Sequence, residues 1–395
     1  MSELTAVLAA RRARYQALLD RTGGSAALLA SGPGVQHATG VRIYSQAIIP
    51  ERPVVAVVGR DRTALAIWEW DAPQVGMEQP DLELATFPEF GRDPWSTVAA
   101  LVTSIAGPSG RVIVEETCPA PAIGALEAVG LEVVIDIGFE GFLAARSVKD
   151  AGEIALATNA AQAADRAIAS VASRQLGGLS ERAVANAIAS AFRERMDGEV
   201  EAAGIVVGPA HLRATHHLAS DEPLTPGAIR LGLMARIDGM WSLLTRMAWG
   251  SDAAGPGGDS GGEPSGAAFA ADYAAYIDAH TAGWQAMRPG VAAGDIYALV
   301  RERLTANGLR LRSPKVGHGT GLSFREAPVL RADDPTPLPA ESVYAFDYAV
   351  YQDSTRSGAF VHVEDRILVT ATGSVRISDV TDTSAPYTLD LSPAR

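Results

Sequence analysis

The stretch at residues 225–249, TPGAIRLGLMARIDGMWSLLTRMAW, decides the fold. Its first half is an apolar run with Met234 and Ile237 near its end, and its second half is apolar again. Between the halves lies Asp238-Gly239, a dipeptide typical of two-residue hairpin turns. The stretch therefore predicts a β-hairpin, and the rest of the chain is interpreted around it.

Composition limits the possible partners. The chain has 395 residues, enough for two domains with a sizeable core. Its net charge of −13 disfavours binding to nucleic acid. The single cysteine, Cys118, excludes an internal disulfide and a cysteine-rich metal site. The N-terminal sequence has neither a signal-peptide pattern nor an apolar run of about 20 residues, so we expect a cytoplasmic protein that does not bind membranes.

The N-terminal part alternates between helical and strand-like patterns. A helical pattern covers residues 4–19, and strand-like runs and further helical patterns follow in alternation, with strands at 26–30, 54–58, 63–68 and 112–114 and helices at 95–105 and 121–129. This alternation predicts an α/β domain at residues 1–147.

The C-terminal part, residues 148–395, repeats an order of elements. Each unit has a long helix, a glycine turn, a shorter helix and a pair of strands, with helices at 151–174, 181–196, 267–287 and 295–307. The shorter helices share an apolar stripe at i, i+4 and i+8. We therefore expect a pseudo-symmetric α+β domain whose curved sheet is covered by helices and whose cleft lies on the open face. The Gly-rich residues 250–266 between the units predict a flexible loop insertion, with an active-site flap as the alternative.

Three motifs near the C-terminus contain chemically active side chains. Residues 316–328, VGHGTGLSFREAP, place His318 among glycines; residues 343–351 contain Asp347; and residues 360–370, FVHVEDRILVT, contain Glu364. In this order the motifs resemble those of the creatinase/aminopeptidase P/prolidase family, the M24-like "pita-bread" proteins. The resemblance covers residues 149–370 and implies an N-terminal creatinase-like α/β domain followed by a pita-bread catalytic domain with a curved antiparallel sheet.

The hairpin departs from the family pattern D-x-G-x-x-x-x-G-Y-x-S-D-x-T-R. Aligned through the matching residues Gly239, Ser242, Thr245 and Arg246, the two metal-binding aspartates of the pattern fall on Gly232 and Leu243. Because neither residue has a side-chain oxygen, a two-metal hydrolytic centre is not expected. The sequence is therefore similar to the metal-free creatinase branch, and we expect neither a metal nor another cofactor.

Candidate roles follow from the resemblance and from side-chain chemistry. Histidine titrates near neutral pH, carboxylates bind cationic groups, and arginine holds carboxylates. We expect the catalytic residues to be His216, His318 and Glu364, with His217 as the alternative to His216. We expect the substrate to contact Asp347, Arg246, Arg325, Glu326, His217 and His362, although Glu326 could instead only brace its loop.

The N-terminal segment 36–44, QHATGVRIY, resembles the family's Y-x-T-G segment. In dimeric relatives this domain reaches the neighbouring cleft. The resemblance therefore implies a homodimer in which Arg42 or Tyr44 completes the partner's site, although a surface loop explains each residue as well.

Three functions remain open. The first is a metal-independent hydrolase or C–N lyase of a small nitrogen-containing metabolite, such as an amidino or N-acyl amino acid. The second is a mononuclear metallohydrolase that uses His318, Asp347 and Glu364. The third is a catalytically inactive binding protein. The retained histidine and carboxylates favour an enzyme.

Overall fold

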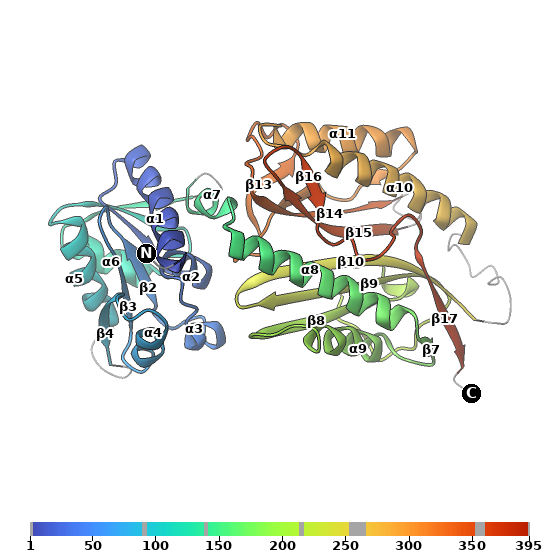
Figure 1. Cartoon of the computed structure of the whole chain (residues 1–395), viewed down its shortest axis with the longest axis horizontal. Helices are drawn as coiled ribbons and strands as arrows, with labels where there is room; N and C mark the ends of the chain where they lie inside the picture. The colour runs from blue at the N-terminus through green and yellow to red at the C-terminus, as the bar shows by residue number, and fades with distance from the viewer. Residues whose placement is uncertain are drawn as a thin grey trace. The chain divides into compact units, whose positions relative to one another are not determined.

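The protein consists of two compact units, Met1–Arg146 and Ser147–Arg395, drawn in Figure 1. The computed structural model describes residues 3–88, 93–137, 141–212, 217–252, 266–351 and 360–393. Within these ranges no helix is long and apolar enough to cross a membrane.

The N-terminal unit is built on a six-stranded sheet in the order β4-β3-β2-β1-β5-β6. Its strands are β1 (Ala26–Leu29), β2 (Val55–Val58), β3 (Thr63–Trp68), β4 (Glu83–Phe87), β5 (Arg111–Glu115) and β6 (Glu132–Asp136). Its helices are α1 (Glu3–Thr22), α2 (Gly32–Thr39), α3 (Tyr44–Ile48), α4 (Ala72–Glu78), α5 (Pro94–Ala106), α6 (Ala120–Ala128) and α7 (Phe142–Ser147). The predicted α/β domain is confirmed. The sequence analysis missed β4 and β6, which are short edge strands that are only partly buried.

The C-terminal unit contains an eleven-stranded sheet among its described residues. The strands are β7 (Gln175–Gly177), β8 (Val200–Val207), β9 (Gly227–Ile237), β10 (Met240–Ser251), β11 (Arg310–Leu311), β12 (Lys315–Gly319), β13 (Glu326–Arg331), β14 (Ser342–Tyr351), β15 (Phe360–Val369), β16 (Ser374–Arg376) and β17 (Tyr387–Pro393). Its long helices are α8 (Ala151–Ala172), α9 (Glu181–Arg193), α10 (Gly266–Ala286) and α11 (Ala293–Ala306). The central strands follow the order β12-β14-β15-β10, and β9 and then β8 continue beyond β10.

The predicted hairpin is confirmed as β9 and β10. Their pairing runs without interruption from Met240 opposite Ile237 to Gly250 opposite Gly227. The turn residues Asp238 and Gly239 have φ angles of 46° and 87°, the positive values that a tight hairpin of this type requires. The adjoining segment 253–265, which holds most of the predicted Gly-rich insertion, lies outside the described residues.

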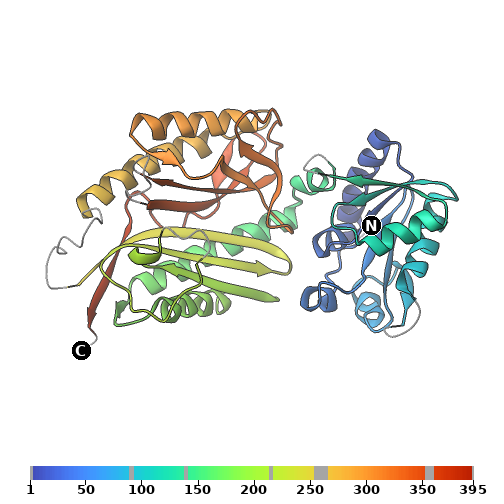
Figure 2. The same ribbon diagram turned by 180° about the vertical axis from the view of Figure 1, so that it is seen from behind.

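The four helices bury the apolar residues of the sheet in two cores. Side chains of α8 and α9 pack with β8, β9 and β10, whereas α10 and α11 pack with β12, β14 and β15. The green α8 lies in front of the hairpin in Figure 1 and behind it in Figure 2, so it covers one face of these strands. The pseudo-symmetric helix-covered sheet expected from the sequence is confirmed.

An ion-pair network joins α8 to the helix-facing side of the sheet. Arg246 on β10 contacts Asp165 of α8 at 3.1 Å and Asp365 of β15 at 2.9 Å. The same guanidinium donates to three backbone carbonyls, those of Thr245, Glu364 and Ser378. Arg246 is 1 % exposed, and its contacts give it a structural position instead of the substrate contact expected from the sequence.

Candidate active site

Strand register brings the motif residues onto one face of the sheet. Thr245 on β10 lies opposite Gly232 on one side and Glu364 on the other, and Glu364 in turn lies opposite Asp347. Because alternate residues of a strand share a face, Leu243 belongs to this face as well. The same alternation adds His362 and Arg366 of β15. These residues, together with the side chains that contact them, form the candidate site.

Asp347 is held between two cationic or hydrogen-donating partners. Its Oδ1 lies 2.7 Å from Nε2 of His362, and its Oδ2 lies 2.6 Å from Nζ of Lys315. Burial alone would raise the pKa of Asp347, but the His362 hydrogen bond and the Lys315 charge hold that pKa well below its usual range. Asp347 therefore remains ionised and orients the His362 ring.

Glu364 has the opposite electrostatic environment although it lies beside Asp347. Its Oε1 is 3.2 Å from Nη1 of Arg366, and Thr245 Oγ1 donates to its Oε2 at 3.4 Å. Burial raises the pKa of Glu364, and the neighbouring charge of Asp347 raises it further. Two adjacent carboxyl groups with pKa values shifted in opposite directions are typical of acid–base sites.

His318 is a buried, neutral histidine. It lies on β12 opposite Ala345, and its Nδ1 is 2.8 Å from the carbonyl oxygen of Gly319. Because a carbonyl only accepts, Nδ1 carries the proton and Nε2 retains its lone pair. Burial, followed by the Lys315 charge, lowers the pKa of His318 to about 3. The residue can accept a hydrogen bond near neutral pH, but it does not titrate there as the sequence analysis assumed.

The glycines of β12 explain how this histidine approaches the neighbouring strands. A Cβ atom at Gly317 would lie 2.6 Å from the carbonyl oxygen of Ala345, and one at Gly319 would lie 2.5 Å from that of Ala327. Both separations are shorter than real Cβ contacts, so larger residues would push β12 away from β13 and β14.

Unpartnered guanidinium nitrogens surround this face. In the described part of the chain, Nε and Nη2 of Arg366 and Nε of Arg230 are buried without a hydrogen-bond partner. Arg230 lies on β9 two residues before Gly232 and therefore on the same face. Buried N–H groups without an acceptor are costly, so an anionic or carbonyl group of a ligand would be stabilised here.

The loop after His318 is braced by a buried ion pair. Glu326 is fully buried and contacts Lys149, while the backbone N–H of Ser323 donates to its Oε1 at 3.1 Å. Arg325 is exposed, and its guanidinium carbon lies 6.0 Å from the Phe324 ring centre. Glu326 thus has the bracing contacts considered as its alternative role.

A second cluster surrounds Glu181 at the start of α9. His211 Nδ1 lies 3.1 Å from one carboxylate oxygen, and His217 Nε2 lies 2.9 Å from the other. Ser220 donates to Glu181 through its backbone and its hydroxyl group, as does the backbone of Gly208. His217 is therefore placed in this cluster, whereas His216 lies outside the described residues.

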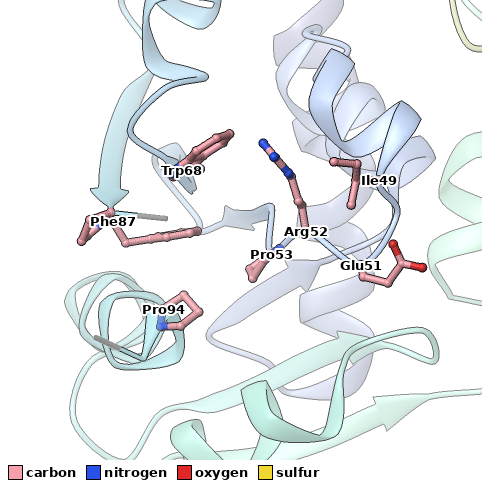
Figure 3. A pocket seen from close by; sticks show the side chains of 8 residues that line it. Ile49, Glu51, Arg52, Pro53, Trp68, Phe87 and Pro94 are labelled. Carbon is pink, nitrogen blue, oxygen red and sulfur yellow. The ribbon is translucent and has the colours of Figure 1, made fainter. Parts of the chain in front are cut away.

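The N-terminal candidates belong to the other unit. Tyr44 begins α3 and is 49 % exposed, and the carbonyl oxygen of Arg42 accepts a hydrogen bond from Gln74. This unit also contains a cavity of about 350 Å³, and in Figure 3 the Arg52 side chain lies near Trp68 at this cavity. The cavity contains none of the motif residues.

Among the residues that the structure describes, two groups of side chains could hold a metal ion. Asp347, His362 and Glu364 offer ligand atoms within 4.8 Å of one another, and so do Glu181, His211 and His217. His318 is not in the first group, so the three-ligand set expected from the sequence differs by one histidine from the set that the structure brings together. At the aligned aspartate positions, Gly232 and Leu243 offer no donor.

Several residues of this face were missed in the sequence. Lys315 stands two residues before the GHG motif, and Arg366 stands two residues after Glu364, where strand alternation would have placed it on the same face. Glu181 and His211 had no signal, because only the fold brings them next to His217.

Comparison with known proteins gives one family match. The model of metallopeptidase family M24 matches residues 155–371, more than half of the chain. The "Probable dipeptidase PepE" of Mycobacterium tuberculosis is 28% identical over 347 residues, which cover 80% of this chain and 83% of that protein.

Solved structures share the fold at lower identity. The Xaa-Pro dipeptidase from Bacillus anthracis has a TM-score of 0.80 and 21% identity, and the match covers 97% of this chain and 100% of that one. The dipeptidase PepE from Mycobacterium ulcerans has a TM-score of 0.76 and 24% identity, with 98% and 99% covered.

Proposed function

The chain belongs to metallopeptidase family M24, and from that premise we propose that it hydrolyses a C–N bond of a small nitrogen-containing metabolite without a two-metal centre. The reacting groups are carboxyl and imidazole groups of β14 and β15. The substrate class is an N-acyl amino acid or a similar molecule with a carboxylate.

The absence of donors in the hairpin supports this proposal. Two cations a few ångströms apart need bridging carboxylates, and Gly232 and Leu243 have none. A Cβ at Gly232 would already lie 3.2 Å from Thr245 Oγ1 and from the Leu244 carbonyl oxygen, so a longer side chain would require its neighbours to move. The residues present therefore do not fit the two-metal centre that the family name implies.

The remaining carboxylates already have cationic partners. Lys315 lies 2.6 Å from Asp347, and Arg366 lies 3.2 Å from Glu364. Introduced divalent cations would have to displace both side chains, and repulsion between like charges opposes this. The cationic partners carry out the charge neutralisation that metals provide elsewhere.

The geometry supports a division of proton transfer between two residues. Ionised Asp347 orients His362, which takes a proton from the attacking water molecule. Water oxygen then bonds to the substrate carbonyl carbon. Glu364, with its raised pKa, gives a proton to the leaving nitrogen as the C–N bond breaks. The unprotonated Nε2 of His318 can accept a hydrogen bond during this reaction.

The charges of the site favour one substrate class over another. Asp347 is already paired with Lys315, whereas Arg366 and Arg230 retain buried N–H groups that meet no acceptor among the described residues. A substrate carboxylate would satisfy these donors, while an amidino cation would meet three positive side chains. We therefore place N-acyl amino acids and dipeptides ahead of amidino compounds, in line with the relatives named as dipeptidases.

A mononuclear metallohydrolase is the second candidate. It is favoured by the close approach of Asp347, His362 and Glu364, a carboxylate–histidine–carboxylate set that suits zinc or iron. Such an ion, when bound, would polarise a carbonyl group or acidify water. The ion would have to compete with Lys315 for Asp347.

Turnover of a substrate panel tests the proposal. N-acetyl amino acids, dipeptides and amidino amino acids are incubated with protein dialysed against a chelator, and the loss of each compound is followed by mass spectrometry. We expect turnover of carboxylate-bearing N-acyl compounds that falls less than tenfold after dialysis. Activity that disappears on dialysis and returns with one metal ion, but not in His362→Gln, would replace the proposal with the mononuclear one. If no compound is turned over and none raises the melting temperature, the proposal fails and the third function, a catalytically inactive binding protein, is favoured.

A further inference from the structure

We propose that Glu181, His211 and His217 form a structural zinc site, separate from the residues of β14 and β15. The three side chains come from the start of α9, the turn after β8 and the chain leading to Ser220. Their ligand atoms lie within 4.8 Å of one another.

The geometry of the cluster suits one small cation. The two histidine nitrogens lie 3.1 and 2.9 Å from different oxygens of the same carboxylate. Ligands of a tetrahedral zinc ion with bonds of about 2.0–2.1 Å are separated by about 3.3 Å, so small movements would admit the ion. The two rings are stacked with centres 4.2 Å apart, which places both on the same side of Glu181.

The carboxylate is prepared for this role by its surroundings. The backbone N–H groups of Gly208 and Ser220 and the Ser220 hydroxyl group donate to its two oxygens. Each carboxylate oxygen has further lone-pair capacity, with which it can bind a cation. The contacts from Gly208 and Ser220 also fix its orientation, as outer-shell partners do in metal sites.

Each imidazole can change from donor to ligand without losing a proton. Because carboxylate oxygens accept, His211 Nδ1 and His217 Nε2 now donate to Glu181. In a neutral ring the proton can move to the other nitrogen, which frees the lone pair that faces the carboxylate. Two neutral imidazoles and one carboxylate form the nitrogen- and oxygen-containing set that zinc accepts, with a fourth position left for water.

Exposure provides a path for the ion. The side chain of Glu181 is 3 % exposed, that of His217 17 % and that of His211 34 %, so the cluster opens towards solvent through its histidines. Bound zinc would connect the chain on either side of residues 212–216 to the start of α9. This segment includes the predicted catalytic His216, but the zinc proposal does not depend on that role.

Zinc binding by the full chain tests the inference. Metal-free protein is dialysed against micromolar zinc, and bound metal is measured by elemental analysis. We expect one zinc per chain in the wild type, a loss of binding in His211→Asn and in His217→Asn, and retention in Asp347→Asn and His362→Gln. Asp221→Asn, an exposed neighbouring carboxylate, is the matched control and should also retain zinc.

The absorption spectrum of the cobalt-loaded wild type tests the inference without relying on variants that could misfold. Cobalt in a four-coordinate nitrogen and oxygen site should give visible absorption bands that zinc removes and that remain in Asp347→Asn. Zinc should also raise the melting temperature of the wild type, because it binds only the folded chain. The inference would be overturned if the wild type bound no zinc. It would also be overturned if binding were lost in Asp347→Asn but retained in His211→Asn and His217→Asn. The second outcome would support the mononuclear site instead.

Discussion

Asp347 and Glu364 face each other on neighbouring strands, yet the fold shifts their pKa values in opposite directions. Lys315 and His362 stabilise the negative charge of Asp347. Glu364 is buried beside that charge, so its proton is held more tightly. At the scale of single residues, this difference assigns orientation to one carboxyl group and proton transfer to the other.

Replacement of Glu364 tests the proton-transfer role. Glu364→Gln retains the shape but cannot exchange a proton, so turnover should fall by about 10²–10⁴, the usual value of general acid–base catalysis. The far-ultraviolet circular dichroism spectrum should stay unchanged. Glu302→Gln, at an exposed position of α11, is the matched control and should retain full activity. Equal activity of the two variants would exclude Glu364 from the reaction.

Replacement of Arg366 should change the pH dependence of kcat through its effect on Glu364. The positive charge of Arg366 opposes the upward pKa shift of Glu364, so its removal in Arg366→Gln should raise that pKa further. As Glu364 acts as an acid, kcat declines when pH rises through its pKa. The alkaline limb of the kcat profile should therefore move to higher pH in Arg366→Gln. A limb that moves to lower pH would contradict this assignment.

His318 predicts a pH dependence of stability. Its pKa is about 3 in the folded protein, against about 6.5 in an unfolded chain. Between these values the unfolded chain binds a proton that the folded protein does not. The free energy of unfolding should therefore fall by about 1.4 kcal/mol for each pH unit below about 6.5. Denaturant titrations at pH 7 and pH 5 should show a smaller loss in His318→Asn, and parallel losses would refute the neutral buried state.

At the scale of elements, β10 uses its two faces differently. Thr245 points to the face of Glu364, whereas Arg246, one residue later, contacts Asp165 of α8. Alternation along a strand therefore separates a reactive face from a helix-bearing face. The sequence motif contains both residues, but it does not tell which of them meets a substrate.

Replacement of Arg246 should affect stability and not substrate binding. Arg246→Gln removes the guanidinium that two buried aspartates share, and Asp165 loses the ion pair that it makes with it, which should cost about 3–5 kcal/mol in unfolding free energy. The exposed pair Arg303–Asp278 supplies the control, and Arg303→Gln should cost at most about 1 kcal/mol. In Arg246→Gln protein that remains folded, KM should be unchanged. A large rise in KM without a loss of stability would restore the substrate-binding role.

At the scale of the whole molecule, the chain folds as two compact units, and the predicted partner-site residues Arg42 and Tyr44 belong to the first of them. The family resemblance leads us to propose a homodimer in which Arg42 or Tyr44 of one chain reaches the cleft of the other. Light scattering should then give about twice the chain mass of 41.2 kDa at micromolar concentration.

Mixed dimers test whether the two chains share a site. If Arg42 or Tyr44 acts on the neighbouring chain, mixing Glu364→Gln with an inactive Arg42→Ala/Tyr44→Ala variant should restore part of the activity, because each mixed dimer contains one intact site. A monomeric mass, or no recovery after confirmed subunit exchange, would contradict this arrangement.

The sequence by itself determined the α/β character of the N-terminal domain, the long helices of the C-terminal domain and the hairpin, because apolar periodicity and the Asp238-Gly239 turn act locally. It also fixed the loss of two carboxylates at Gly232 and Leu243, since a missing side-chain oxygen needs no structure to recognise. The family match over residues 155–371 agrees with the fold expected from the sequence.

Only the tertiary structure decided which charges the remaining polar residues meet. Lys315 of β12 contacts Asp347 of the neighbouring strand β14, and Glu181 contacts two histidines from another part of the chain. Such contacts join residues far apart in sequence, and burial determines how strongly their charges interact. No local sequence pattern therefore encodes these interactions. For the same physical reason, His318 was expected to titrate near neutral pH until its depth in the fold was known.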